Sequence, residues 1–231
     1  MRSAGCVIND FADRDFDPHV ERTKTRPIAA GHIGAGIALI GFIGMLLIAL
    51  LLVLQTSWFV VQLSVIGALL AAIYPFVKRF THFPQAWLGM SFGWGAVMAW
   101  AAVHGTITDS PLPWLLFIAN IFWSICYDTA YALGDKPDDL KIGVKSTAIW
   151  LGDRAVPVIV ALGIIVLILL AIVASALHPV VWLGWLAAAL WQAKISFTLL
   201  KAGEPGGFTF FLQSHWTGLA FCIGLLAQAF I

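Results

Sequence analysis

The acidic residues of this 231-residue chain are concentrated in two short stretches, which together hold eight of its twelve Asp and Glu side chains. The first stretch, "NDFADRDFD", places Asn9, Asp13 and Asp17 four residues apart. In a helix this spacing puts all three side chains on one face. Carboxylates so close together repel one another, and the groups that could neutralise them are solvent, basic side chains or a metal ion.

The second stretch, "YDTAYALGDKPDDLKIGVKST", repeats this pattern with Asp128, Asp135 and Asp139, which also fall on one helical stripe. Two such stripes facing each other across a cavity suit Mg²⁺, which is usually held by one or two carboxylates and completes its coordination with phosphate oxygens and water. Solvated loop charges paired with nearby Lys and Arg are the alternative for any single Asp, but the matching D-x-x-x-D cores disfavour it. The sequence therefore predicts two Mg²⁺ sites that together bind a diphosphate.

The elements that position these stretches are membrane helices. The chain is 61% hydrophobic and only 11% charged, with a mean hydropathy of +0.92, whereas soluble domains are about 45–50% apolar and about 25% charged. Its formal net charge of +1 gives no reason to expect a nucleic-acid partner. A spanning helix needs about 20 apolar residues. The sequence therefore predicts an all-α polytopic membrane protein with seven full transmembrane helices, at 34–54, 57–76, 86–104, 112–132, 155–177, 179–200 and 210–231.

The charged residues are distributed unevenly about these helices. With this helix count, both acidic stretches and all Lys and Arg after Arg2 lie at one side of the membrane, and the connections on the other side contain no Lys or Arg. The positive-inside rule makes the charged side cytoplasmic, or the matrix side of a mitochondrial inner membrane. Residues 1–8 are too short to span, and we expect them to be the last turns of a helix that begins upstream.

Arg2 lies within this short apolar run, seven residues before Asn9 and on the same helical face. A cation inside a spanning segment costs about 2.5–3.5 kcal/mol on insertion scales unless it faces a polar cavity or a partner. We interpret Arg2 as a ligand for an anionic group deep in the cavity, with snorkelling to the interface as the alternative.

These residues resemble the UbiA superfamily of intramembrane aromatic prenyltransferases. "NDFADRDFD" followed by "HVERTKTRPIAAG" is similar to the first motif of the superfamily, N-D-x-x-D-x-x-x-D, and "YDTAYALGDKPDD" is similar to the second, D-x-x-Y-A-x-x-D-x-x-x-D. "GCVINDFADRDFD", "YPFVKRFTHFPQ" and "DDLKIGVKSTA" are most similar to the members that prenylate 4-hydroxybenzoate in ubiquinone biosynthesis. The resemblance covers residues 1–231 as one domain. It implies a nine-helix bundle that lacks its first helix and most of its second here.

The resemblance also implies an activity and residue roles. A polyprenyl chain would pass from polyprenyl diphosphate to the ring carbon ortho to the hydroxyl of 4-hydroxybenzoate, with Mg²⁺ as cofactor and the lipid of a bacterial or mitochondrial inner membrane as surroundings. The implied Mg²⁺ ligands are Asn9, Asp13 and Asp17 for one ion and Asp135 and Asp139 for the other, with Asp128 completing the second site or positioning the phenol. The implied substrate ligands are Arg22, Arg26 and Lys78 for the diphosphate, Arg2 and Asn9 for the benzoate carboxylate, and Tyr131 in the cavity.

Other functions compete with this interpretation. A sister enzyme with a dihydroxynaphthoate, haem or chlorophyllide acceptor would share both motifs, although Arg2 and "KIGVKST" favour the benzoate. A transporter with carboxylate ion sites would place them on broken helices near the midplane, whereas both stretches here lie at helix ends on one face. For the basic residues, membrane topology alone is the alternative explanation. An inactive fragment is the third interpretation.

Overall fold

The computed structural model describes residues 2–19, 23–143 and 145–231, and in these ranges it contains helices and no β-strand. Seven helices are long and apolar enough to cross a membrane, so the predicted fold class and number of spans are confirmed. The helices are α1 (Arg2–Ala12), α2 (Ala35–Val53), α3 (Trp58–Phe80), α4 (Pro84–His104), α5 (Leu112–Ile142), α6 (Thr147–Leu151), α7 (Ala155–Ser175), α8 (Val181–Ala202) and α9 (Gly207–Ala227).

The largest difference from the predicted helix boundaries lies where the chain leaves the apolar layer. The expected helix 112–132 continues as α5 to Ile142, through Pro137. Hydropathy detects only the membrane-embedded part of a helix, whereas the helical hydrogen bonds carry α5 on into its acidic segment. The short helix α6 follows; Ser146 begins it by accepting a hydrogen bond from the backbone N–H of Ile149. The consequence is that all the aspartates of the second acidic stretch lie on one helix.

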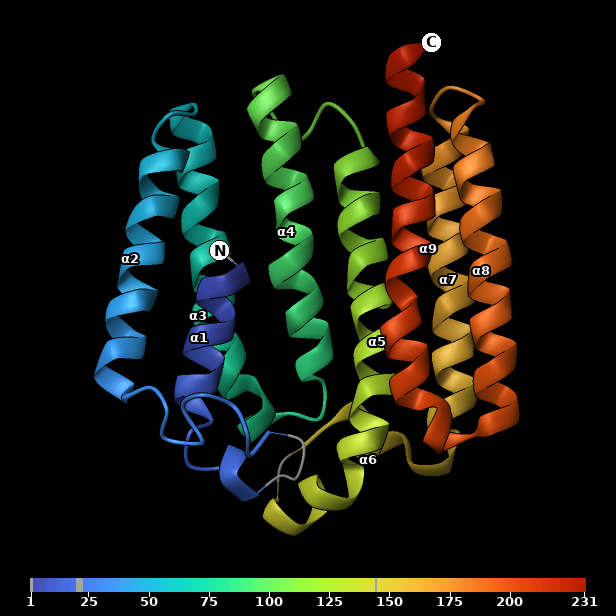
Figure 1. Ribbon diagram of the computed structural model, residues 1–231. Helices are drawn as coiled ribbons and strands as arrows, with labels where there is room; N and C mark the ends of the chain where they lie inside the picture. Colours follow the sequence, from blue (N-terminus) through green and yellow to red (C-terminus); the bar gives the residue numbers. More distant parts are fainter. Residues whose placement is uncertain (1, 20–22, 144) are drawn as a thin grey trace.

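The long helices run up and down the bundle, and the connections that contain Lys and Arg lie at one end (Figure 1). The end of α1, the end of α3, the beginning of α4 and the acidic segment of α5 meet there. The end of α9 lies at the opposite end of the bundle. The prediction that both acidic stretches share one end of the bundle is therefore confirmed.

Helices α4 and α5 approach closely because glycine lines their contact. A Cβ atom added to Gly89 would lie 2.6 Å from the Cα of Ile121, and one added to Gly93 would lie 3.1 Å from the carbonyl oxygen of Phe117. The side-chain amide of Asn120 donates a hydrogen bond of 2.8 Å to the carbonyl oxygen of Gly89. Small residues and interhelical hydrogen bonds are the usual means of packing helices in a membrane. They fix the beginning of α4 relative to α5.

The other side of α5 is held by α9 and by the turn that precedes it. A Cβ atom added to Gly207, the first residue of α9, would collide with the carbonyl oxygen of Ala130. Lys136 Nζ lies 2.6 Å from Glu204 Oε1, an ion pair that joins α5 to this turn. These contacts fix the position of α5 relative to α9 and the turn before it.

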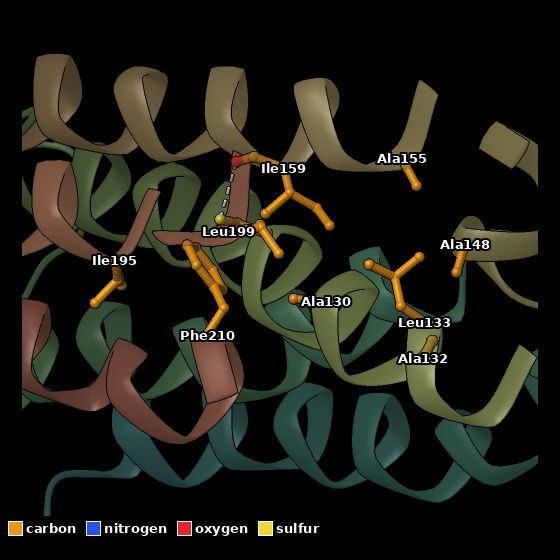
Figure 2. Close-up of a cluster of buried hydrophobic side chains, with 10 residues drawn as sticks. Ala130, Ala132, Leu133, Ala148, Ala155, Ile159, Ile195, Leu199 and Phe210 are labelled. Carbon is orange, nitrogen blue, oxygen red and sulfur yellow. Dashed lines mark hydrogen bonds between the residues drawn. The ribbon is translucent and has the colours of Figure 1, made fainter. Parts of the chain in front are cut away.

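A hydrophobic cluster fills the space between α5, α7, α8 and α9 (Figure 2). Leu133, Ile159, Leu199 and Phe210 are buried in it, and the thiol of Cys126 donates a hydrogen bond of 3.2 Å to the carbonyl oxygen of Ile159. The cluster lies directly behind the acidic face of α5. In contrast, α2 buries only Ala38, and its long apolar side chains are mostly exposed.

Candidate active site

A polar pocket of about 160 Å³ lies between the two acidic stretches. It contains the sequence-predicted residues whose side chains the structure describes: Asn9, Asp13, Asp17, Arg26, Asp128, Tyr131, Asp135 and Asp139 all line it. Two stretches separated by more than 100 residues therefore share one cavity. Their chemical roles stay predictions.

Three other predicted residues fall outside this description. Arg22 lies outside the described residues. Arg2 and Lys78 belong to α1 and α3, but their side chains are not among those described. Their proposed contacts with substrate stay predictions.

The first acidic stretch does not form one regular helix, contrary to the expectation. Helix α1 ends at Ala12, and Asp13 and Asp17 follow it in a turn and a short 3₁₀-helix. Hydrogen bonds between residues four apart are nevertheless kept: the backbone N–H of Asp13 donates to Asn9 O at 2.9 Å, and that of Asp17 donates to Asp13 O at 2.8 Å. Asp13 is only 2% exposed and Asp17 only 6%. Both carboxylates are thus taken out of bulk water at the pocket wall.

Arg26 is the basic partner of this stretch. Its Nη1 lies 2.9 Å from Asp10 Oδ1 and 3.0 Å from Asp17 Oδ2. Burial raises the pKa of Asp17 above its ordinary value, the guanidinium of Arg26 opposes this, and the charge of Asp13 adds to the rise. Asp13 and Asp17 are a buried pair of like charges, which is an environment that a divalent cation would stabilise.

Arg79 positions this stretch, although the sequence identifies it only as one of the Lys and Arg residues at one side of the membrane. Its guanidinium donates a hydrogen bond of 3.0 Å to the carbonyl oxygen of Ala12, where α1 ends. It also lies over the rings of Phe16 and Phe76, 5.5 and 5.4 Å from their centroids. A cation at the C-terminus of a helix is favourable. Nothing in the spacing signals this contact, because 67 residues separate its two ends.

The second acidic stretch is presented by one face of α5, as predicted. Asp135 and Asp139 lie near the end of the helix, and Asp128 lies about 10 Å further into the bundle, at 1.5 Å per residue. The helix ends at Gly143, whose φ of 73° suits a glycine and turns the chain back toward the pocket. The chain after this turn supplies Lys145 and Ser146 to the pocket wall.

Several pocket residues were missed by the sequence analysis. All of them lie within segments quoted for the family resemblance, which was the available signal, but none of them is an acidic position of the two motifs. The missed residues that line the pocket are Phe16, Thr23, Tyr74, Pro84, Gln85, Ala132, Lys145 and Ser146.

A larger, mainly apolar cavity of about 730 Å³ adjoins the polar pocket, between α1, α2, α3 and α4. Asn9, Arg26 and Tyr74 line both spaces. Most of the other wall residues are apolar, among them Trp94 and Phe92. The two spaces together suit an amphiphile with an anionic head and a long apolar tail.

The donor atoms of the polar pocket fit Mg²⁺. They are carboxylate and amide oxygens from both walls, which a hard cation prefers. Among the described residues, no three Asp, Glu, His or Cys side chains converge on one point. Mg²⁺ takes few protein ligands and keeps positions for phosphate oxygens and water.

Known proteins are similar to this chain in sequence and in fold. The model of the UbiA prenyltransferase family matches residues 1–227. The chain is 47% identical to a 4-hydroxybenzoate octaprenyltransferase from Methylococcus capsulatus, over 99% of this chain and 78% of that protein. It is 48% identical to one from Xanthomonas campestris pv. campestris, over 98% of this chain and 75% of that protein.

Solved structures agree. The fold matches the apo structure of a UbiA homolog from Aeropyrum pernix K1 with a TM-score of 0.86 at 23% identity, over 98% of this chain and 84% of that one. It matches a UbiA homolog from Archaeoglobus fulgidus, bound to GPP and Mg²⁺, with a TM-score of 0.66 at 19% identity, over 98% and 83%. With seven apolar helices it is an integral membrane protein, and the chain belongs to the UbiA prenyltransferase family.

Proposed function

We propose that this chain transfers a polyprenyl group from polyprenyl diphosphate to the 3-position of 4-hydroxybenzoate, releasing diphosphate, as a step of ubiquinone biosynthesis. The observation that carries the proposal is the carboxylate-lined pocket joined to an apolar cavity. The choice of acceptor rests on relatives 47–48% identical that are named 4-hydroxybenzoate octaprenyltransferase.

The residues around the pocket would bind the diphosphate in two ways, through Mg²⁺ and directly. Asn9, Asp13 and Asp17 would hold one Mg²⁺ from the first wall, and Asp135 and Asp139 a second from α5. When bound, Mg²⁺ neutralises negative charge on the leaving diphosphate. The guanidinium of Arg26 lies at the junction of the two spaces, where it binds diphosphate oxygens directly.

The apolar cavity receives the prenyl tail and keeps water from the allylic carbon. As the C–O bond of the donor breaks, its electron pair leaves with the diphosphate. The ring carbon ortho to the phenol oxygen then forms the new C–C bond and loses its proton. Asp128 and Tyr131 lie deeper along α5 than Asp135, which suits them to position the phenol. Exclusion of water protects the allylic cation from hydrolysis.

Arg26→Lys is expected to raise the KM for the donor about tenfold while changing kcat less, because a lysine cannot span two carboxylates and a phosphate oxygen with one planar fork. Steady-state kinetics with varied donor concentration measure this. Arg154→Lys, at an exposed site outside the pocket, is the matched control. An unchanged KM in Arg26→Lys would contradict direct binding by Arg26.

We also propose that the pocket faces the cytoplasm in the inner membrane of a bacterium. The support is that the Lys- and Arg-rich connections lie at the pocket end of the bundle. A phosphatase that folds only outside the cytoplasm should be active when fused after Ile231, and inactive when placed between Lys201 and Glu204. The opposite pattern would reverse the orientation.

The deciding experiment is prenyl transfer from a long-chain diphosphate to labelled 4-hydroxybenzoate in membranes that contain this chain. We expect labelled product with Mg²⁺ and none after chelation. A dihydroxynaphthoate acceptor serves as the comparison. Transfer to the dihydroxynaphthoate alone would show that the acceptor is wrong, and transfer to neither would refute the proposed reaction.

A further inference from the structure

Helix α4 begins at the wall of the polar pocket. Its first two residues, Pro84 and Gln85, line the pocket, and no side chain caps this end of the helix. The 21-residue helix presents its positive dipole end here, and such ends bind anions. Neither acidic stretch belongs to this wall of the pocket. The beginning of α4 can therefore contact an anion without taking a ligand away from a metal ion.

Gln85 points a buried amide into this pocket. The residue is 2% exposed, and its Oε1 lies 2.7 Å from the hydroxyl oxygen of Thr147, itself only 3% exposed. The same hydroxyl lies 2.9 Å from the carbonyl oxygen of His82, so its single proton is shared between two acceptors. In this arrangement the carbonyl half of the amide faces Thr147.

The NH₂ half of the amide is then left for the pocket. No hydrogen bond from Gln85 Nε2 to another described residue is present, although Gln85 lines the cavity. Gln85 Nε2 is not one of the fully buried polar atoms that lack a partner in the described part of the chain. It is therefore a donor that a ligand in the pocket can reach, and an anionic oxygen is a suitable acceptor for it. The orientation of the amide depends on Thr147, which lies 62 residues further along the chain.

A neutral donor has an advantage over a cation at this wall. Arg26 shows what a cation does in this pocket, since it pairs with Asp10 and Asp17. A second arginine or lysine at position 85 would be drawn to the remaining carboxylates and would compete with Mg²⁺ for them. An amide can donate to a phosphate oxygen without neutralising a metal ligand.

We propose that Gln85, oriented by Thr147 at the N-terminus of α4, donates a hydrogen bond to a non-bridging oxygen of the donor's diphosphate group. This inference rests on the proposed function for the identity of the ligand. Gln85 is the binding residue, and Thr147 is a positioning residue that acts through it.

Binding of inorganic pyrophosphate to the purified chain tests the proposal without turnover. Gln85→Leu keeps the approximate volume and removes the donor, and it is expected to weaken pyrophosphate binding with Mg²⁺ by about tenfold or more in isothermal titration calorimetry. Gln85→Glu adds a negative charge at the same size and should weaken it further. In turnover, both variants should raise the KM for the donor and leave the KM for 4-hydroxybenzoate nearly unchanged.

Two further pairs of variants separate binding from folding. Thr147→Ser keeps the hydroxyl and should bind pyrophosphate like the parent chain, whereas Thr147→Val should lose several-fold in affinity. Gln192→Leu removes another buried glutamine, which is bonded to Ser196 and Thr217 between α8 and α9. It should lower the thermal unfolding temperature without changing pyrophosphate affinity.

Unchanged pyrophosphate affinity in Gln85→Leu and Gln85→Glu would overturn the proposal, and so would a change confined to the KM for 4-hydroxybenzoate. If Gln85→Leu fails to fold, Thr147→Val against Thr147→Ser decides in the same way. A chain that binds pyrophosphate through Gln85 but prenylates no acceptor would support this subsite and refute the proposed reaction.

Discussion

Asp13→Asn is expected to lower kcat/KM for prenyl transfer by about 1000-fold while the protein folds normally. The substitution keeps the size of a side chain that is 2% exposed and removes the charge with which it would hold Mg²⁺. Neutralising a leaving diphosphate contributes several kcal/mol, and each 1.36 kcal/mol corresponds to about a tenfold change in rate. The measurement is transfer to labelled 4-hydroxybenzoate over a range of Mg²⁺ concentrations.

Stability separates this chemical effect from damage to the fold. Asp13 and Asp17 are buried like charges, so removing one of them should leave the thermal unfolding temperature unchanged or raise it. Asp153→Asn, an exposed carboxylate outside the pocket, is the control for any non-specific effect of losing an acidic side chain. Turnover within tenfold of the parent chain in Asp13→Asn would remove Asp13 from the metal site.

Asp135→Asn is expected to cause a loss of similar size from the opposite wall. Asp135 lies on α5, whose position is fixed by Gly89 on one side and by Gly207 on the other, so the substitution should leave the backbone in place. Initial rates at saturating Mg²⁺ measure the loss.

The double variant of Asp13 and Asp135 gives the sharper result. If the two walls act on one leaving group, the double variant should be little worse than either single variant, because residues that act as a unit are strongly non-additive. Additive losses would show that the two carboxylates serve separate steps. Asp135→Glu, which keeps the charge but shifts it by one methylene, should retain more activity than Asp135→Asn.

The sequence was sufficient for the number of spanning helices and for the meeting of the acidic stretches. Hydropathy reports directly on transfer into lipid, and the helical repeat places Asp128, Asp135 and Asp139 on one face of α5. It was insufficient where a helix continues into water, as α5 does to Ile142.

Contacts between distant segments were also invisible in the sequence. Arg79 at the end of α1 and Gln85 against Thr147 each depend on helices that pack only in the folded bundle. Neither residue belongs to a repeated spacing, and a glutamine in a short connection is ordinarily a solvated one. Such polar contacts become apparent only when burial and hydrogen-bond partners are known.

The junction at Asn9, Arg26 and Tyr74, where the polar pocket meets the apolar cavity, has a consequence for the choice of donor length. Under the proposed function the reacting carbon sits at this junction, so additional isoprene units extend only into the cavity and toward lipid. A tail that leaves a bilayer exchanges one apolar environment for another and gains little hydrophobic free energy. We therefore expect affinity for the donor to come mainly from its diphosphate head group. Preference among tails of different length should depend on the shape of the cavity along α2, α3 and α4. That shape can vary while the reaction at the polar pocket stays the same.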